Sequence, residues 1–154
     1  MNTQFTLGVY EGSLAPEFDD EILRAQLVQI TALLKNNNVT KLSNGADYVV
    51  KLPLQTAQGE ILVALKVFKR QSWLKDRFDR KQKSKAERSY VAACHLQAHN
   101  IGTPAPIAWL DRWENNRLLE SYFLCVFQPA ICLRDALSDI YFNTRDNAPL
   151  MELL

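Results

Sequence analysis

The sequence predicts one α+β domain built around an antiparallel sheet of five strands. A chain of 154 residues with 47% hydrophobic residues is long enough to bury a single core. Short apolar stretches separated by turn-forming residues alternate with two stretches of helical periodicity, which is the pattern of an α+β fold. The predicted order is helix, three strands, helix, two strands and the start of a further helix.

The first part of this order is a helix over residues 19–35 followed by a β-meander. The helix opens with an acidic cluster, has apolar residues at helical spacing and ends at the Asn36–Asn38 run. The segments between the strands, Ser43-Asn44-Gly45 and 56–59, are typical of turns. Three strands are predicted, at residues 39–42, 48–52 and 61–68.

The second part begins with a helix over residues 82–99, which is stopped by Asn100-Ile101-Gly102, where Gly102 is suited to a left-handed cap. Two strands at 107–113 and 121–127 then pair as a hairpin, and Pro129 ends the second because proline cannot donate to a ladder. Residues 133–142 are predicted to start another helix.

The charge is unevenly distributed. The net charge is +1, yet residues 66–88 hold ten Lys and Arg against three Asp and Glu. Such a basic segment favours an anionic partner, such as a nucleotide phosphate, a nucleic acid or a lipid headgroup. A solvated helix face with long basic side chains is the structural alternative.

The cysteines and the apolar segments indicate the compartment. Cys94, Cys125 and Cys132 have no paired spacing and stand among apolar neighbours, as expected of reduced, buried thiols. Residues 1–12 do not resemble a signal peptide, and no window approaches the ~20 apolar residues of a membrane span. We therefore expect a cytoplasmic protein whose contact with a membrane would be peripheral.

The candidate functional residue is Lys66. Side chains alternate across a strand, so Lys66 shares a face with Leu62, Ala64 and Phe68. An ammonium group on an apolar face is costly unless it finds an anion. Glu87 lies 21 residues later in the second helix and is a candidate partner. The alternative is an edge-strand lysine that reaches water along its stem.

These residues resemble a known family. Val63-Ala64-Leu65-Lys66 is similar to the third-strand V-A-I-K motif of protein-kinase-like folds, Glu87 to the glutamate of their αC helix, and residues 122–128 to the fifth strand and hinge. Residues 66–70, 86–90 and 101–106 resemble, more narrowly, the lipopolysaccharide kinases that phosphorylate Kdo or heptose sugars. The resemblance implies the amino-terminal lobe of a kinase-like fold.

The resemblance also implies roles for single residues in binding ATP. Lys66 would contact the α and β phosphates, Glu87 would orient Lys66, and Ala64 would pack against the adenine. Ser43, Asn44 and Gly45 stand in the place of the glycine-rich loop. They hold one glycine where that loop has several, and the residues by themselves favour a hairpin turn at Asn44-Gly45. The backbone of the hinge, at Val126, Phe127 and Gln128, would hydrogen-bond the adenine.

The catalytic residues of this family are not found in the sequence after Gln128. Phosphoryl transfer in kinases needs a catalytic-loop aspartate and metal-binding asparagine and aspartate residues. We therefore expect no catalytic and no metal-binding residue in this chain, with Mg²⁺ ligands supplied by a missing lobe. The implied domains are an N-terminal helical extension (1–38), the kinase-like lobe (39–130) and the start of a truncated second lobe (131–154).

Three alternatives stay open. The chain could be a noncatalytic kinase-like binding module, or a small nucleic-acid-binding domain that uses the basic segment, although its tryptophans fit a core better than a base-stacking surface. His95 and His99, at i and i+4, have metal-ligand spacing but no further ligand cluster. As partners we expect a nucleotide and an anionic glycolipid acceptor at the inner membrane, with self-association through an exposed face that includes Leu124 and Phe127.

Overall fold

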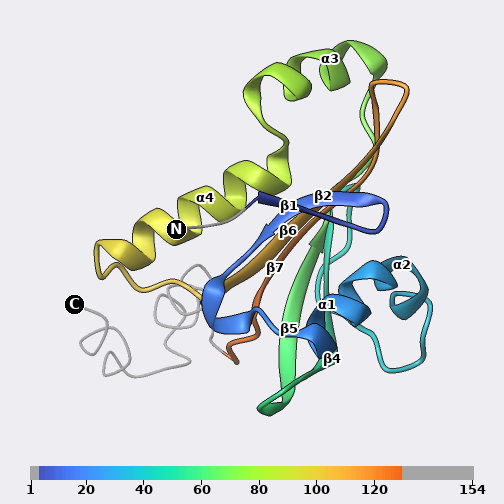
Figure 1. Cartoon of the computed structure of the whole chain (residues 1–154). Coiled ribbons are helices and arrows are strands. Elements are labelled where there is room, and N and C mark those ends of the chain that lie inside the picture. Colours follow the sequence, from blue (N-terminus) through green and yellow to red (C-terminus); the bar gives the residue numbers. More distant parts are fainter. Residues whose placement is uncertain (1–3, 130–154) are drawn as a thin grey trace, which may run out of the picture.

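The computed structural model describes residues 4–129, which form an α+β domain around a seven-stranded antiparallel sheet (Figure 1). The strand order across the sheet is β1-β2-β6-β7-β5-β4-β3. The strands are β1 (Gln4–Leu7), β2 (Tyr10–Leu14), β3 (Thr40–Lys41), β4 (Tyr48–Thr56), β5 (Gly59–Val67), β6 (Pro106–Glu114) and β7 (Arg117–Val126). The helices are α1 (Glu21–Val28), α2 (Ile30–Leu33), α3 (Trp73–Gln82) and α4 (Lys85–Ala98), with a 3₁₀ turn at Pro16–Phe18.

The α+β class and the antiparallel sheet are confirmed, but the prediction of five strands is wrong. The two additional strands, β1 and β2, lie in a segment that was expected to be helical. They form a hairpin around Gly8, whose φ of +61° suits glycine, and β2 then pairs with β6. The N-terminal segment is therefore part of the same sheet.

The five other strands follow the predicted order along the chain. β3, β4 and β5 form a meander, and β7 lies between β5 and β6 because the chain crosses over through α3 and α4 before it returns to the sheet. Lys66 of β5 lies opposite Phe123 of β7 in this register. The predicted helix start at residues 133–142 lies outside the described residues.

The main core lies between one face of the sheet and helices α1 and α2. Asp20 caps α1 by accepting a hydrogen bond from the backbone N–H of Leu23 at 2.8 Å. The apolar side of these helices is fully buried on the sheet, where each large side chain contributes about 1.5–3 kcal/mol by its burial. The central members of this core are Leu23, Leu27, Ile30, Val50, Leu52, Leu54, Val63, Leu65 and Leu124.

The burial of Leu124 corrects a prediction. Leu124 is 0% exposed in the main core, so it cannot belong to an exposed face for self-association. The physical reason is strand alternation, because Tyr122 and Leu124 point into the main core while Phe123 and Cys125 point to the opposite face. Phe127 is half-buried.

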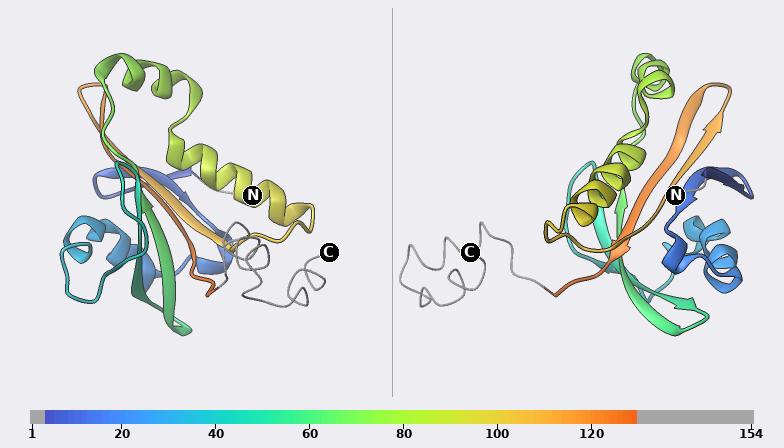
Figure 2. Two further views of the ribbon diagram at one scale, coloured as in Figure 1. Left: turned by 180° about the vertical axis from the view of Figure 1, so that it is seen from behind. Right: turned by 60° about the vertical axis from the view of Figure 1, so that its left-hand side comes forward.

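Helix α4 packs on the opposite face of the sheet, mainly over β6 and β7 (Figures 1 and 2). Ala86 and Tyr90 of α4 join a second apolar cluster with Phe68, Trp109 and the half-buried Phe123. Among the described residues, this leaves the part of the face formed by β4 and β5 without a helix on it. Leu62, on that part, is 45% exposed.

Within residues 4–129, no helix has the length and apolar character needed to cross a membrane.

Candidate functional site

Lys66 lies on the part of the sheet that α4 does not cover. Val63 and Leu65 are fully buried in the main core, so Leu62, Ala64 and Lys66 point to the opposite face, as the alternation predicts. Lys66 is half-buried, and its Nζ lies 5.1 Å from the centroid of the Phe68 ring. The ammonium group is therefore held over an aromatic ring on this face.

A second lysine lies on the same face. Lys51 of β4 is the cross-strand partner of Ala64, and directly opposed residues share a face. Its Nζ lies 5.0 Å from the centroid of the Phe127 ring. Lys51 was not among the expected site residues, although the alternation of the buried Val50, Leu52 and Leu54 would have placed it on this face. Lys51, Leu62, Ala64 and Lys66, with the ring of Phe127, are called the lysine face below.

Glu87 does not pair with Lys66, so the expected ion pair is wrong for this conformation. The Glu87 carboxylate lies 3.2 Å from Lys83 Nζ instead. Ala86 faces the sheet, so its neighbours Lys85 and Glu87 point to opposite sides of α4. Lys85 takes the side toward the turn before β4, and Glu87 takes the side toward β6 and the N-terminal hairpin.

The carboxylate of Asp47 feels the charge of Lys66. Asp47, in the turn before β4, accepts a hydrogen bond from the backbone N–H of Lys69 at 2.8 Å and one from Lys85 Nζ at 3.1 Å. The Lys69 N–H first, and then Lys85 and the charge of Lys66, hold the pKa of Asp47 below its usual value of 3.8. Asp47 thus joins the turn, the end of β5 and the start of α4.

The turn expected in the place of the glycine-rich loop is the hairpin connection between β3 and β4. The Ser43 hydroxyl accepts a hydrogen bond from the Val49 N–H at 2.9 Å and closes this connection. Gly45 has a φ of +146°, a backbone conformation that residues other than glycine rarely adopt. Asn44 is exposed beside it. The structure therefore supports the hairpin-turn interpretation of Asn44-Gly45.

The hinge-like residues have part of their backbone already engaged. The Val126 N–H donates to the Ala105 carbonyl at 2.9 Å, and the Phe127 N–H donates to the Leu62 carbonyl at 2.8 Å. These two N–H groups are therefore not available to an adenine ring in this conformation. Gln128 is exposed next to them.

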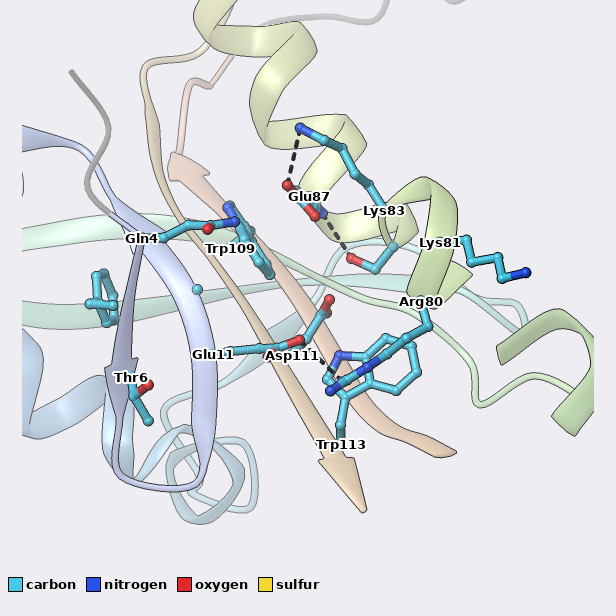
Figure 3. A pocket seen from close by; sticks show the side chains of 13 residues that line it. Gln4, Thr6, Glu11, Arg80, Lys81, Lys83, Glu87, Trp109, Asp111 and Trp113 are labelled. Atoms are coloured by element: carbon cyan, nitrogen blue, oxygen red, sulfur yellow. Dashed lines mark hydrogen bonds and ion pairs between the residues drawn. The ribbon is translucent and has the colours of Figure 1, made fainter. Parts of the chain in front are cut away.

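Glu87 lines a cavity of about 600 Å³ between the N-terminal hairpin, β6 and helices α3 and α4 (Figure 3). Figure 3 shows Glu11, Asp111, Glu87 and Trp109 around this space. The guanidinium group of Arg80 lies 3.6 Å from the Glu11 carboxylate and stacks over the Trp113 ring at 4.8 Å. The exposed Arg80 thus closes one side of the cavity.

Asp111 is the most deeply buried acid of this cavity. Its side chain is 2% exposed and accepts a hydrogen bond from the Ser121 hydroxyl at 2.6 Å. Burial raises the pKa of Asp111 from 3.8 to about 7, and the negative charges of Glu11 and Glu87 add to this rise. Asp111 therefore carries a proton for part of the time at neutral pH.

The described residues offer no constellation for a metal ion. No group of three or more His, Cys, Asp and Glu side chains comes together within residues 4–129. The rings of His95 and His99 lie 4.1 Å apart on α4, and His99 Nδ1 contacts the His95 carbonyl at 2.8 Å. Within the described residues, neither Cys94 nor Cys125 takes part in a disulfide, and Cys132 lies outside these residues.

Comparison of the chain with models of protein families, with curated proteins and with solved structures found no match. Any function assigned to this chain therefore depends on its own residues and on the resemblance carried by its motifs.

Proposed function

We propose that this chain is the nucleotide-binding lobe of a kinase-like phosphotransferase, with the nucleotide on the lysine face. The observation that carries the proposal is the pair of ammonium groups, from Lys51 and Lys66, on a half-apolar surface that no described helix covers. Leu62 and Ala64 provide the flat apolar area on which a base would pack. The strand order, with helices α3 and α4 between β5 and the last two strands, is compatible with such a lobe.

Contacts with phosphate are expected to be stronger than the contacts that Lys51 and Lys66 make with aromatic rings. A lysine over an aromatic ring gains about 0.5–1 kcal/mol at an exposed site. A charge-assisted hydrogen bond to a phosphate oxygen contributes about 1.5–3 kcal/mol. Lys51 and Lys66 would therefore leave the rings of Phe127 and Phe68 when a di- or triphosphate binds, and the rings would remain beside the base.

The role of Glu87 differs from the one that the resemblance implies. Glu87 is held by Lys83 on the other side of α4, whereas the charge of Lys66 helps to lower the pKa of Asp47. Asp47 would orient Lys66 in this lobe, with Lys85 and the Lys69 N–H fixing the carboxylate. Glu87 would reach Lys66 only after a rotation of α4.

The rest of the reaction stays a prediction from the resemblance. The acceptor would be an inner-core sugar of lipopolysaccharide, reached from the cytoplasmic side of the membrane. Mg²⁺ would be held by residues of a second lobe, together with the catalytic aspartate. A noncatalytic module of the same fold would share the nucleotide site and lack the transfer step.

Titration of the full chain with ATP and with adenosine tests the proposal. Amide spectra or calorimetry should show saturable ATP binding, with shifts at β4 and β5, and much weaker binding of adenosine. The double variant Lys51→Gln/Lys66→Gln should weaken ATP binding by about 10-fold or more, since two phosphate contacts are lost. Lys35→Gln is the matched control, because Lys35 is exposed and distant in the chain from this face.

Unchanged ATP affinity in Lys51→Gln/Lys66→Gln, with the fold intact, would exclude the lysine face as the nucleotide site. If ATP binds as proposed, an assay for phosphate transfer to Kdo or heptose, with a second lobe present, separates the enzyme from the noncatalytic module.

A further inference from the structure

A second cavity, of about 370 Å³, lies where the chain leaves β5 and enters α3. Its lining carries four basic side chains and one acidic side chain. The basic residues are Lys69, Arg70, Lys75 and Lys85, and the acid is Asp47. These residues are called the basic cavity below. They come from the turn before β4, from the connection after β5 and from the first residues of α3 and α4, so the fold gathers charges that are spread along the sequence.

The single acid does not neutralise the basic cavity. Asp47 is bound by the Lys69 N–H and by Lys85 Nζ, and its lowered pKa keeps it ionised at neutral pH. Four positive charges against one negative charge leave an excess of three. Arg70 and Lys75 are exposed and form no ion pair among the described residues, so both are free to bind an anion.

The N-terminus of helix α3 opens at the same cavity. Ser72 is its N-cap residue, with extended backbone angles, but its side chain makes no capping hydrogen bond. The N–H groups of the first turn of a helix lack partners within the helix and carry a partial positive charge. Ser72 and Lys75 both line the cavity, so this end of α3 adds N–H donors to the basic side chains.

We infer that the basic cavity is a phosphate-binding site for a phosphate monoester. A monoester carries nearly two negative charges at neutral pH and presents three acceptor oxygens, which suits an excess of three positive charges with a helix N-terminus. A carboxylate has one charge and two oxygens and would use fewer of these donors.

The basic cavity is separate from the lysine face. No residue of the lysine face lines the basic cavity, whereas Asp47 does. The Asp47 carboxylate would repel a phosphate chain that extended from Lys66 into the cavity. We therefore infer that the two sites take different phosphates. In the proposed function the cavity would seat a phosphate group of the acceptor, and this last assignment alone rests on the proposed function.

The test is a titration of the full chain with glycerol 3-phosphate, followed by amide spectra at low salt. The expected result is saturable shifts at residues 69–76 and at Lys85, which weaken as salt is added. Arg70→Gln/Lys75→Gln should raise the dissociation constant by about 10-fold, while Lys35→Gln leaves it unchanged. Shifts spread evenly over all basic residues would overturn the site.

A capping variant separates lost binding from lost structure. Ser72→Asp places a carboxylate at the N-terminus of α3, where it caps the helix and occupies the position of the phosphate. It should abolish phosphate binding while the thermal midpoint stays the same or rises. Retained phosphate affinity in Ser72→Asp contradicts the inference.

Crossed variants and other probes distinguish the two sites and the source of the phosphate. Lys51→Gln/Lys66→Gln should weaken ATP binding and spare glycerol 3-phosphate, and Arg70→Gln/Lys75→Gln should do the reverse. Competition between ATP and glycerol 3-phosphate for one site would overturn the separation.

Binding to phosphatidic acid vesicles, but not to pure phosphatidylcholine vesicles, would indicate a lipid source. Binding to an RNA oligonucleotide without any response to the monoester would refute the phosphate-monoester site.

Discussion

Asp76 of α3, whose side chain is fully buried, forms an ion pair with Arg117 at the start of β7, with 2.9 Å between Oδ2 and Nε. Together with the exposed Arg80–Glu11 pair, it links α3 to the sheet. Because Ser72 and Lys75 belong to the same helix end, the pair also fixes one wall of the basic cavity.

Loss of Arg117 should therefore be costly. Arg117→Gln leaves the buried Asp76 carboxylate without its cation and should lower the free energy of unfolding by about 3 kcal/mol, measured by urea denaturation. The double variant Asp76→Asn/Arg117→Gln removes both charges and should recover part of this loss. Equal stability of Arg117→Gln and the native chain would show that the pair contributes nothing.

Asp111 should make stability depend on pH. Its pKa is raised from 3.8 to about 7 in the folded chain, so the folded state binds the proton more tightly than the unfolded state. The stabilisation is present below the unfolded pKa and is lost as pH rises through the folded pKa. From pH 5 to pH 8 this group should lower the free energy of unfolding by about 2 kcal/mol.

Asp111→Asn is the matching variant, since the amide oxygen still accepts from the Ser121 hydroxyl. The variant should show a flatter dependence of unfolding free energy on pH over the same interval. If the native chain and the variant gave parallel curves of unfolding free energy against pH, Asp111 would have an ordinary pKa in the folded chain.

Gly12 should be intolerant of a side chain. A Cβ at this position would lie 2.2 Å from the Trp109 carbonyl oxygen, which belongs to the neighbouring strand β6. Gly12→Ala should therefore destabilise the chain by more than about 2 kcal/mol or separate β2 from β6. Gly102→Ala is the control, since nothing lies within 4 Å of its Cβ position, and thermal unfolding of both variants makes the comparison.

Asp47→Asn should raise the phosphate affinity of the basic cavity. The amide oxygen can still accept from the Lys69 N–H, but the only negative charge of the cavity is removed. Because the carboxylate no longer repels the phosphate, the dissociation constant for glycerol 3-phosphate should fall by about 3-fold, measured by the same titration. Weaker binding would show that Asp47 acts mainly by positioning Lys85.

The sequence allowed most of the sheet and the long helix to be predicted, because alternation and helical periodicity are local. It did not allow β1 and β2 to be recognised. Gly12 and Ser13 of β2 are buried although neither is apolar, so the usual signal of a buried strand is missing there. The one local sign of the hairpin was Gly8, between Leu7 and Tyr10.

The candidate site was predictable in part for the same reason. Strand alternation placed Lys66 on the correct face, but periodicity shows only which residues share a side of a helix, not toward which strand that side turns. Glu87 was therefore assigned to Lys66 although it lies on the other side of α4. Asp47 was missed because its contacts with Lys69 and Lys85 depend on tertiary structure.

The pairing of β2 with β6 affects how the chain is made. Tyr10–Leu14 pairs early with Gln4–Leu7, but its second partner is Pro106–Glu114, which leaves the ribosome after nearly all the other described elements. Closing a loop of this length delays folding. The backbone groups of β2 that pair with β6 therefore stay unpaired while α1 and the central meander collapse. Nascent chains that stop before β6 are therefore the forms most exposed to aggregation and to proteases.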